Sequence, residues 1–269
     1  MGNDVKLDIE ARFEHARDVI RDAGKRAMKY YDGTAGDLEI EAKENALDMV
    51  SIADKNVEAI IRDRIADSFP EDGFLGEEMG IEKGDNDCLW VIDPIDGTAC
   101  FVNQMPSWCI SLALVVDNEI VLGLIYHPCG DELFTARLGE GAFANGEPIK
   151  ASSAKTVGDG LLGLGMSHRT KSDEITGFIK ELLDREGIFV RNGSGALMMA
   201  YAAAGRLIGY YEPHINPWDC MAGIILMREA GGWANDYLGV PDVLENGAPI
   251  LTAGPDVAEE LKTMSGVTQ

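Results

Sequence analysis

The spacing of apolar residues changes at Leu89, and this change restricts the fold more than any other feature of the sequence. Before it, apolar residues recur at helical spacing over residues 8–31 and 54–69, which predicts two helices. After it, the runs LWVI, CISLALVV, EIVLGLIY and ELFTAR follow one another across short polar breaks. Short breaks between strand-like runs favour antiparallel neighbours, so we expect a mostly antiparallel sheet that ends near residue 150.

The second half of the chain alternates between the two kinds of spacing. Strands are predicted at 161–165, at IFVR and at LIGYYE, and helices at 173–185, through GALMMAYAAAG and through PWDCMAGIILMREA. Strands that alternate with helices favour layered packing. We therefore predict an α+β protein built as a layered αβαβα sandwich, with an α+β half at 1–150 and a smaller α/β half at 151–269.

The acidic composition limits the partners of the protein. The chain has 46 acidic and 23 basic residues and a formal net charge of -23. Such a surface repels nucleic acids and anionic membranes, so we expect neither to bind directly. No run is apolar enough to span a bilayer, and the first residues lack the features of a signal peptide, so a cytoplasmic location is expected. The five cysteines form no CxxC pair, which argues against a disulfide framework or a zinc site.

Several carboxylates fall where the predicted strands and helices begin or end. They are Asp54, Glu77 with Glu78, Asp93 with Asp96, and Asp219. Taken singly, each has a structural explanation as a solvated pair, a turn residue, a helix cap or a residue in the first turn of a helix. Asp93 and Asp96 resist this explanation, because the strand before them is predicted to be buried on both faces and no lysine or arginine lies between residues 84 and 136. A hard divalent cation would relieve their repulsion, and Mg²⁺ is the favoured ion.

Three motifs occur in the order GEE, WVIDPIDGT and PWDCMAGIILMREAGG. In this order and at these separations they resemble the inositol monophosphatase family of Mg²⁺-dependent, lithium-sensitive phosphatases. The resemblance covers nearly the whole chain, including the segments GLIYHPCGDELFTARLGEGAFANGEPI and NGSGALMMAYAAAGRLIGYYE. It implies a phosphoric monoester hydrolase that acts on a small phosphorylated polyol, with myo-inositol 1-phosphate as the favoured substrate. It also implies a homodimer.

The resemblance implies a role for each matching residue on the catalytic side. The ligands of two or three Mg²⁺ ions would be Glu77, Asp93, Ile95 through its backbone carbonyl, Asp96 and Asp219. Asp93 would bridge two of these ions. Thr98 and Asp54 would orient the attacking water, so that Thr98, Asp54 and Asp93 form the catalytic set.

On the substrate side, the implied contacts come from three segments. They are Gly97 and Thr98, then Gly193, Ser194, Gly195 and Ala196, then Glu212. Gly97 and Thr98 would donate backbone N–H groups to the phosphate, and Glu212 would accept hydrogen bonds from the substrate's hydroxyl groups. Ala99 and Cys100 stand where the family often has a polar or basic residue and then an asparagine or a similar side chain. This departure leaves the choice of substrate open.

Alternatives remain for both the substrate and the class of function. Histidinol phosphate, fructose-1,6-bisphosphate and 3′-phosphoadenosine 5′-phosphate are rival substrates within the superfamily, because fold does not determine substrate. Glu212 favours a polyol, but it suits the cationic amine of histidinol almost as well, whereas no base-binding insertion is evident for an adenine nucleotide. The other class is a regulatory protein that binds the transcription or ribosome-assembly machinery, as some bacterial members of this family do.

Overall fold

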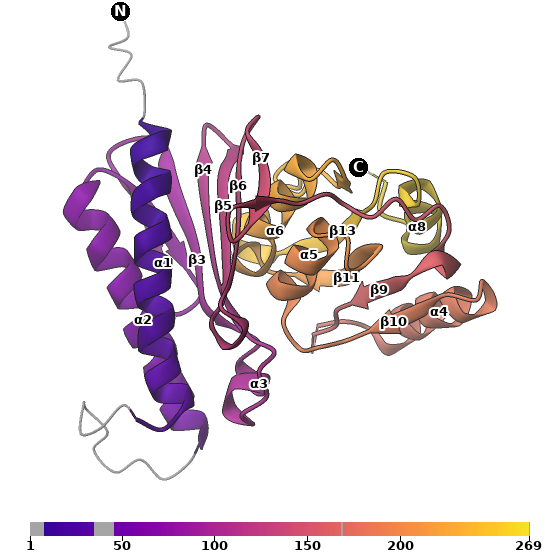
Figure 1. Ribbon diagram of the computed structural model, residues 1–269, viewed down its shortest axis with the longest axis horizontal. Coiled ribbons are helices and arrows are strands. Elements are labelled where there is room, and N and C mark those ends of the chain that lie inside the picture. Colours follow the sequence, from indigo (N-terminus) through magenta and orange to yellow (C-terminus); the bar gives the residue numbers. More distant parts are fainter. Residues whose placement is uncertain (1–7, 35–45, 168, 269) are drawn as a thin grey trace, which may run out of the picture.

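Two long helices cover one face of the larger sheet. The computed structural model describes residues 8–34, 46–167 and 169–268, and it shows α1 (Ile9–Tyr31) and α2 (Ala46–Ser68) packed against each other (Figure 1). Helix α1 confirms the prediction at 8–31. The predicted start of the second helix at residue 54 is wrong, because α2 begins at Ala46. The segment ALDMV contains no glycine or proline that would stop a helix, so the helix extends through it.

The larger sheet has eight strands in the order β2-β1-β3-β4-β5-β6-β7-β8. Their bounds are β1 (Gly73–Gly76), β2 (Gly80–Glu82), β3 (Cys88–Asp96), β4 (Cys109–Val116), β5 (Glu119–His127), β6 (Glu132–Arg137), β7 (Gly141–Ala144) and β8 (Glu147–Pro148). All neighbouring pairs are antiparallel except β1 and β3, which are parallel. Strands β3 to β6 confirm the four predicted runs. Strands β1, β2, β7 and β8 were not predicted, and each is at most four residues long.

The smaller sheet has five strands in the order β10-β9-β11-β13-β12. Their bounds are β9 (Leu161–Leu164), β10 (Ile188–Val190), β11 (Gly209–Ile215), β12 (Trp233–Ala234) and β13 (Ala248–Ala253). Strand β9 runs parallel to β10 and β11, whereas β13 is antiparallel to β11 and β12. The three predicted strands correspond to β9, β10 and β11. Strands β12 and β13 were not predicted from the sequence.

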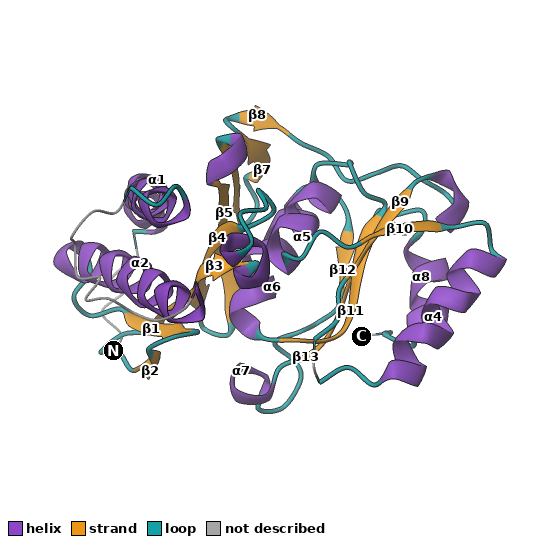
Figure 2. Ribbon diagram, turned by 90° about the horizontal axis from the view of Figure 1, so that it is seen from below, coloured by secondary structure: helices purple, strands orange, loops and turns teal. Residues whose placement is uncertain are grey.

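Helices α5 (Gly195–Ala203) and α6 (Pro217–Glu229) lie between the two sheets. Figure 2 shows five layers in turn: α1 with α2, the larger sheet, α5 with α6, the smaller sheet, and α4 (Ser172–Asp184) with α8 (Ala258–Ser265). This arrangement confirms the predicted αβαβα sandwich. Seven of the nine residues of α5 and nine of the thirteen residues of α6 are buried, as expected for helices that are apolar all round and covered on both sides.

The short helices complete the chain. They are α3 (Thr98–Val102), α7 (Val243–Asn246) and the 3-10 turns at Pro128–Gly130 and Val157–Asp159. Helices α7 and α8 were not predicted, so α6 is followed by two further helices and is not the last one of the chain. In the part of the chain that the structure describes, none of the helices combines the length and the apolar character needed to cross a membrane.

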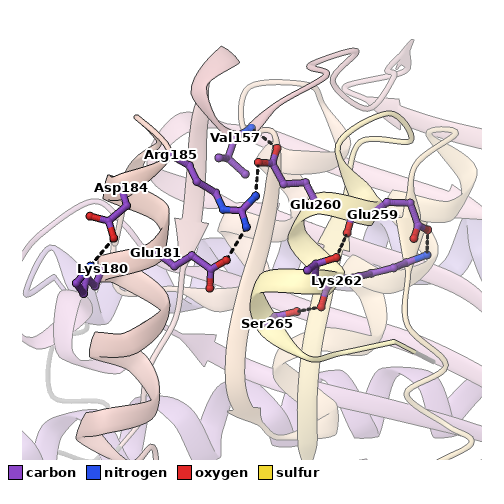
Figure 3. A network of polar contacts seen from close by, with 10 residues as sticks. Val157, Lys180, Glu181, Asp184, Arg185, Glu259, Glu260, Lys262 and Ser265 are labelled. Atoms are coloured by element: carbon purple, nitrogen blue, oxygen red, sulfur yellow. Dashed lines mark hydrogen bonds and ion pairs between the residues drawn. The ribbon is translucent and has the colours of Figure 1, made fainter.

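Ion pairs connect the two outer helices α4 and α8. Arg185, which follows the last turn of α4, donates to Glu181 at 2.7 Å and to Glu260 of α8 at 3.0 Å (Figure 3). Glu260 also accepts a hydrogen bond from the backbone N–H of Val157 at 3.0 Å. Exposed ion pairs of this kind contribute at most about 1 kcal/mol each, so this network chiefly orients the outer layer.

The strands separate along the chain close to the predicted division at residue 150. All strands of the larger sheet lie within residues 73–148, and all strands of the smaller sheet lie within residues 161–253. Helix α6 nevertheless packs directly on β3, β4 and β5 of the larger sheet. One apolar core therefore includes residues from both parts, and the division into two parts stays a prediction.

Candidate active site

A β-bulge brings Asp93 and Asp96 together at the end of β3. In a regular strand, residues three apart point to opposite faces of the sheet. Here Asp93 pairs with Ser111 and Asp96 pairs with Cys109, so β3 contains one residue more than β4 in this interval. Because an extra residue of this kind changes the direction in which the following side chains point, both carboxylates reach the same place. Asp93 is then fixed by the backbone N–H of Ile95, which donates to its Oδ1 at 3.0 Å.

Asp219 reaches the same place from the first turn of α6. The side-chain oxygens that Asp93, Asp96 and Asp219 offer all lie within 4.8 Å of one another, and these three residues are called the carboxylate cluster below. Pro217 opens α6, and Asn216 caps it while donating to Asp219 Oδ2 through its side chain at 3.2 Å. The sequence placed Asp219 in the first turn of this helix, and the structure confirms that position.

Asp96 is held by the N-terminus of α5. The hydroxyl of Ser194 donates to its Oδ2 at 2.5 Å, and the backbone N–H groups of Ala196 and Gly195 donate at 2.7 and 3.3 Å. Hydrogen bonds to an ionised carboxylate are short and strong, and the positive end of the helix dipole adds to them. The structure thus stabilises negative charge on Asp96 although this residue is buried.

Burial and mutual repulsion raise the pKa values of these carboxylates. Loss of water raises the pKa of Asp93 well above its usual value, and the charges of Glu77, Asp219 and Asp96 raise it further. Burial raises the pKa of Asp96 to about 7, while its hydrogen bonds from Ser194 and from α5 act in the opposite direction. Without a counter-charge, the cluster therefore favours bound protons over negative charge.

Asp54 and Glu77 extend the acidic region on the side of α2 and β1. Burial, followed by the charges of Glu78 and Glu58, raises the pKa of Asp54 to about 8. Partial loss of water and the charge of Asp219 also raise the pKa of Glu77, but its side chain is exposed, so solvent screens these effects. Asp54 was considered as a possible helix cap, which is wrong because it lies more than two turns inside α2.

The donor set fits a hard divalent cation. Among the described residues, no lysine or arginine forms an ion pair with Asp54, with Glu77 or with any member of the carboxylate cluster. Asp54 Oδ1 is buried and has no hydrogen-bond partner. Buried carboxylates without a counter-charge are strongly unfavourable, and oxygen atoms are the ligands that Mg²⁺ and Ca²⁺ prefer. These residues therefore form a site that could bind metal ions.

Ile95, Gly97 and Thr98 form the turn that follows the bulge. Gly97 has a φ of +98°, and a Cβ there would lie 2.8 Å from the backbone oxygen of Ser107, so only glycine fits. Thr98 begins α3 and donates its hydroxyl to the carbonyl of Ile95 at 3.2 Å. Helix α3 packs against α2, the helix that carries Asp54. The roles predicted for Thr98 and Asp54 in orienting water stay predictions.

A cavity of about 110 Å³ adjoins the carboxylate cluster. It is lined by Asp96, Gly165, Met166, Arg191, Gly193, Gly195, Met198, Tyr210, Glu212, Ile215 and Asp219. The predicted substrate residues Gly193, Gly195 and Glu212 thus share one cavity with two of the predicted metal ligands. Ser194 and Ala196 are fully buried, and both donate hydrogen bonds to Asp96. Their contact with substrate stays a prediction.

Cys100 connects α3 to the loop that precedes α5. Its Sγ donates to the backbone oxygen of Asn192 at 3.1 Å, and it lies against the α-carbon of Gly193. Burial raises the pKa of its thiol. Cys100 therefore has a packing role next to the cavity, and it does not line the cavity itself.

Several residues of this site were not predicted from the sequence. Tyr210, Gly165 and Arg191 line the cavity, and Cys109 contacts both Asp96 and Ser194. Strand alternation was a usable signal for Tyr210, because a residue two positions before Glu212 on a strand lies on the same face. The others come from separate elements, and no local pattern marks them.

Size alone does not identify the site. A larger cavity of about 210 Å³ lies between α1 and β6 and includes Arg17, Arg21 and Arg137. Each of these arginines is paired with an exposed carboxylate, on Glu14, Asp131 and Glu10 respectively. The smaller cavity is the one that adjoins the carboxylate cluster, so the candidate site is assigned there.

The fold and the site together define a layered α/β protein with a carboxylate cluster, suited to divalent cations, beside a small polar cavity. A family model described as the inositol monophosphatase family matches residues 8–265. The chain belongs to the inositol monophosphatase family, which confirms the resemblance seen in the sequence. Membership of this family indicates that the protein is a phosphatase.

Individual relatives agree with this assignment. An inositol-1-monophosphatase of Rhizobium meliloti (strain 1021) is 35% identical over 257 residues, which cover 94% of this chain and 92% of the relative. The Nus factor SuhB of Escherichia coli (strain K12) is 35% identical over 244 residues, or 90% of each chain. The solved structure of an inositol monophosphatase from Anabaena (Nostoc) sp. PCC 7120 matches with a TM-score of 0.81 and 32% identity over 96% of each chain.

Proposed function

We propose that the protein hydrolyses a small phosphate monoester in a Mg²⁺-dependent reaction, and that its substrate is myo-inositol 1-phosphate, which yields inositol and phosphate. The observation that carries this proposal is the carboxylate cluster, in which Asp93 and Asp96 are buried and Asp219 is partly buried, and which has no ion-pair partner among the described residues. A protein with a net charge of -23 can hold a phosphate only where cations offset its own charge. The names of its relatives support the same substrate.

The residues that would hold two or three Mg²⁺ ions each offer an oxygen atom as a ligand, and they lie at or near the ends of helices and strands. They are Glu77, Asp93, Ile95 through its carbonyl, Asp96 and Asp219. When bound, the ions would lower the pKa of water and neutralise the charge on the phosphate. Hydrogen bonds behind the carboxylates support the assignment, because Ser194 and α5 orient Asp96 while Asn216 orients Asp219. Inhibition by Li⁺ belongs to the same proposal.

The remaining residues would position water and substrate. Thr98 and Asp54 orient the attacking water, with the buried Asp54 as proton acceptor. The backbone N–H groups of Gly97 and Thr98 face the phosphate. Glu212 lines the cavity and accepts hydrogen bonds from hydroxyl groups of the polyol. Because phosphoryl transfer passes through a loose, charge-rich transition state, such positioning and electrostatics supply most of the catalysis.

Substrate kinetics test the proposal. Hydrolysis of myo-inositol 1-phosphate, histidinol phosphate and fructose-1,6-bisphosphate is measured with Mg²⁺ and again with excess EDTA. We expect the highest kcat/KM for myo-inositol 1-phosphate and no turnover in EDTA. A higher kcat/KM for either rival would reassign the substrate, and turnover in EDTA would contradict the metal dependence.

A second function follows from the relatives named Nus factor SuhB. We propose as the alternative that the chain also binds a protein of the transcription machinery, since its charge disfavours direct contact with RNA. Pull-down of RNA polymerase with the wild-type protein and with Asp93→Asn tests this. Capture by both proteins supports a regulatory function separate from catalysis, and capture by neither removes the alternative. A homodimer and a cytoplasmic location remain predictions.

A further inference from the structure

Strand β11 presents Tyr210 and Glu212 to the cavity and Tyr211 to the opposite side. Residues two apart on a strand share a face, and both Tyr210 and Glu212 line the cavity beside the carboxylate cluster. Tyr211 instead packs against Phe178 of α4, with ring centroids 4.4 Å apart. The two neighbouring tyrosines therefore have different surroundings, although both are buried.

The hydroxyl of Tyr210 forms a hydrogen bond with the carboxylate of Glu212. It donates to Oε2 at 2.5 Å, within the range of a strong hydrogen bond to a charged acceptor. The other carboxylate oxygen, Oε1, forms no hydrogen bond with any residue in the described part of the chain and is not sealed from the cavity. A glutamate side chain has three rotatable bonds, and this single contact fixes which oxygen is available to a ligand.

Two glycines make the space that this pair occupies. A Cβ at Gly165 would overlap both the hydroxyl of Tyr210 and Oε2 of Glu212, and a Cβ at Gly195 would lie 3.0 Å from the same hydroxyl. Neither glycine has a positive φ, so the backbone conformation does not require glycine at these positions. Glycine is required there because the Tyr210–Glu212 pair occupies the space that a side chain would fill.

We propose that Tyr210 is a positioning residue that holds Glu212 with Oε1 directed to the substrate, and so makes the site selective for esters with hydroxyl groups next to the phosphate. This inference rests on the proposed function and deepens it. Tyr210 itself acts through Glu212 and does not contact the reacting phosphate. Its loss therefore affects binding of the polyol part more than the chemistry at phosphorus.

The test compares two matched tyrosine variants on two substrates. Tyr210→Phe and Tyr211→Phe each remove one buried hydroxyl from β11, and myo-inositol 1-phosphate is compared with phenyl phosphate, which has no hydroxyl groups. For Tyr210→Phe we expect KM for the polyol ester to rise roughly tenfold, with the ratio of kcat/KM values (polyol over phenyl ester) falling by the same factor. Tyr211→Phe should leave this ratio at the wild-type value.

A double-mutant cycle separates positioning from general support of the fold. If Tyr210 acts only through Glu212, then adding Tyr210→Phe to Glu212→Ala causes no further change in the ratio, because alanine leaves no side-chain oxygen for Tyr210 to position. Equal losses on both esters in Tyr210→Phe, or multiplied losses in the double variant, would overturn the proposal. If Tyr210→Phe does not fold, Gly165→Ala carries the test, because its Cβ displaces the pair and should cause the same selective loss.

The wild-type protein distinguishes this proposal from the proposed function. If it hydrolyses neither ester with Mg²⁺, the proposed function fails before any variant is compared. If it hydrolyses both esters and Tyr210→Phe keeps the wild-type ratio, only the positioning role of Tyr210 fails.

Discussion

Ser194 donates a 2.5 Å hydrogen bond to Asp96 and thereby joins the start of α5 to the end of β3. The same hydroxyl caps α5 by accepting from the backbone N–H of Leu197 at 3.2 Å. One buried side chain thus fixes a member of the carboxylate cluster and also the helix whose N–H groups hold it. The two parts of the chain meet at this contact.

Replacing Ser194 by alanine should weaken both the fold and the metal site. Loss of the cap lowers the free energy of unfolding by about 1–2 kcal/mol, and loss of an orienting contact to a ligand lowers metal affinity by roughly 10- to 100-fold. Urea denaturation and calorimetric titration with Mg²⁺ measure the two effects. Ser265→Ala, in the last turn of α8 away from the site, is the control. Wild-type Mg²⁺ affinity in Ser194→Ala would contradict the role assigned to this contact.

Asp93→Asn should abolish activity while the protein stays folded. The asparagine keeps an oxygen that can accept from the N–H of Ile95, so the local turn is preserved. It removes a group that must either take up a proton or bury a charge on folding, so the Tm of the metal-free protein at neutral pH should rise. Steady-state hydrolysis should fall by more than about 100-fold, because the variant lacks one of the proposed ligands of the ions that would supply most of the catalysis.

The exposed residue Asp131 offers a control for this variant, because Asp131→Asn removes the same charge in the turn before β6, outside the cluster. It should retain wild-type turnover. Mg²⁺-dependent hydrolysis that persists in Asp93→Asn at the wild-type rate would show that the cluster is not the catalytic site.

The sequence predicted the layers of the fold and named the candidate metal-binding residues. It did not predict how these residues come together in space. Strand-like runs identified β3 to β6 and helical spacing identified α1, because burial imposes these patterns locally. The bulge that turns Asp93 and Asp96 to one side depends on pairing with β4, which the letters DPID do not specify. The contact of Ser194 with Asp96 likewise depends on packing between distant segments. Short edge elements such as β2 and β8 carry too few residues for a period to be recognised.

The stability of the metal-free protein should fall as pH rises. The pKa values of Asp54 and Asp96 are raised from 3.8 to about 8 and about 7 in the folded state, so the native protein binds more protons than the unfolded chain in this range. Stability therefore declines with increasing pH between about pH 4 and about pH 8. Thermal melts in EDTA measure this slope.

Bound Mg²⁺ should remove most of this pH dependence, because cations replace the protons and stabilise only the native state. In EDTA, Asp54→Asn should reduce the slope of Tm against pH, since it deletes one of the buried carboxylates whose pKa is raised. A Tm in EDTA that rises between pH 5 and pH 8 would contradict the assignment of a buried, unpaired acidic cluster.

Gly193→Ala tests whether Cys100 limits the shape of the cavity wall. Gly193 has a φ of +100°, and a Cβ there would overlap the Sγ of Cys100. The substitution should lower the free energy of unfolding by roughly 2–4 kcal/mol, as the sum of backbone strain and overpacking. Gly231→Ala is the matched control, because Gly231 has a φ of +82° with no atom within 4 Å, so it reports backbone strain alone.

Adding Cys100→Ala to Gly193→Ala should recover the overpacking part of the loss and leave the backbone part. The free energies of unfolding, measured in urea for the two single variants and the double variant, give the coupling between the two positions. If Gly193→Ala and Gly231→Ala lose the same stability, then Cys100 places no steric limit on this wall. In that case the packing of Cys100 against Gly193 does not fix the position of the loop before α5.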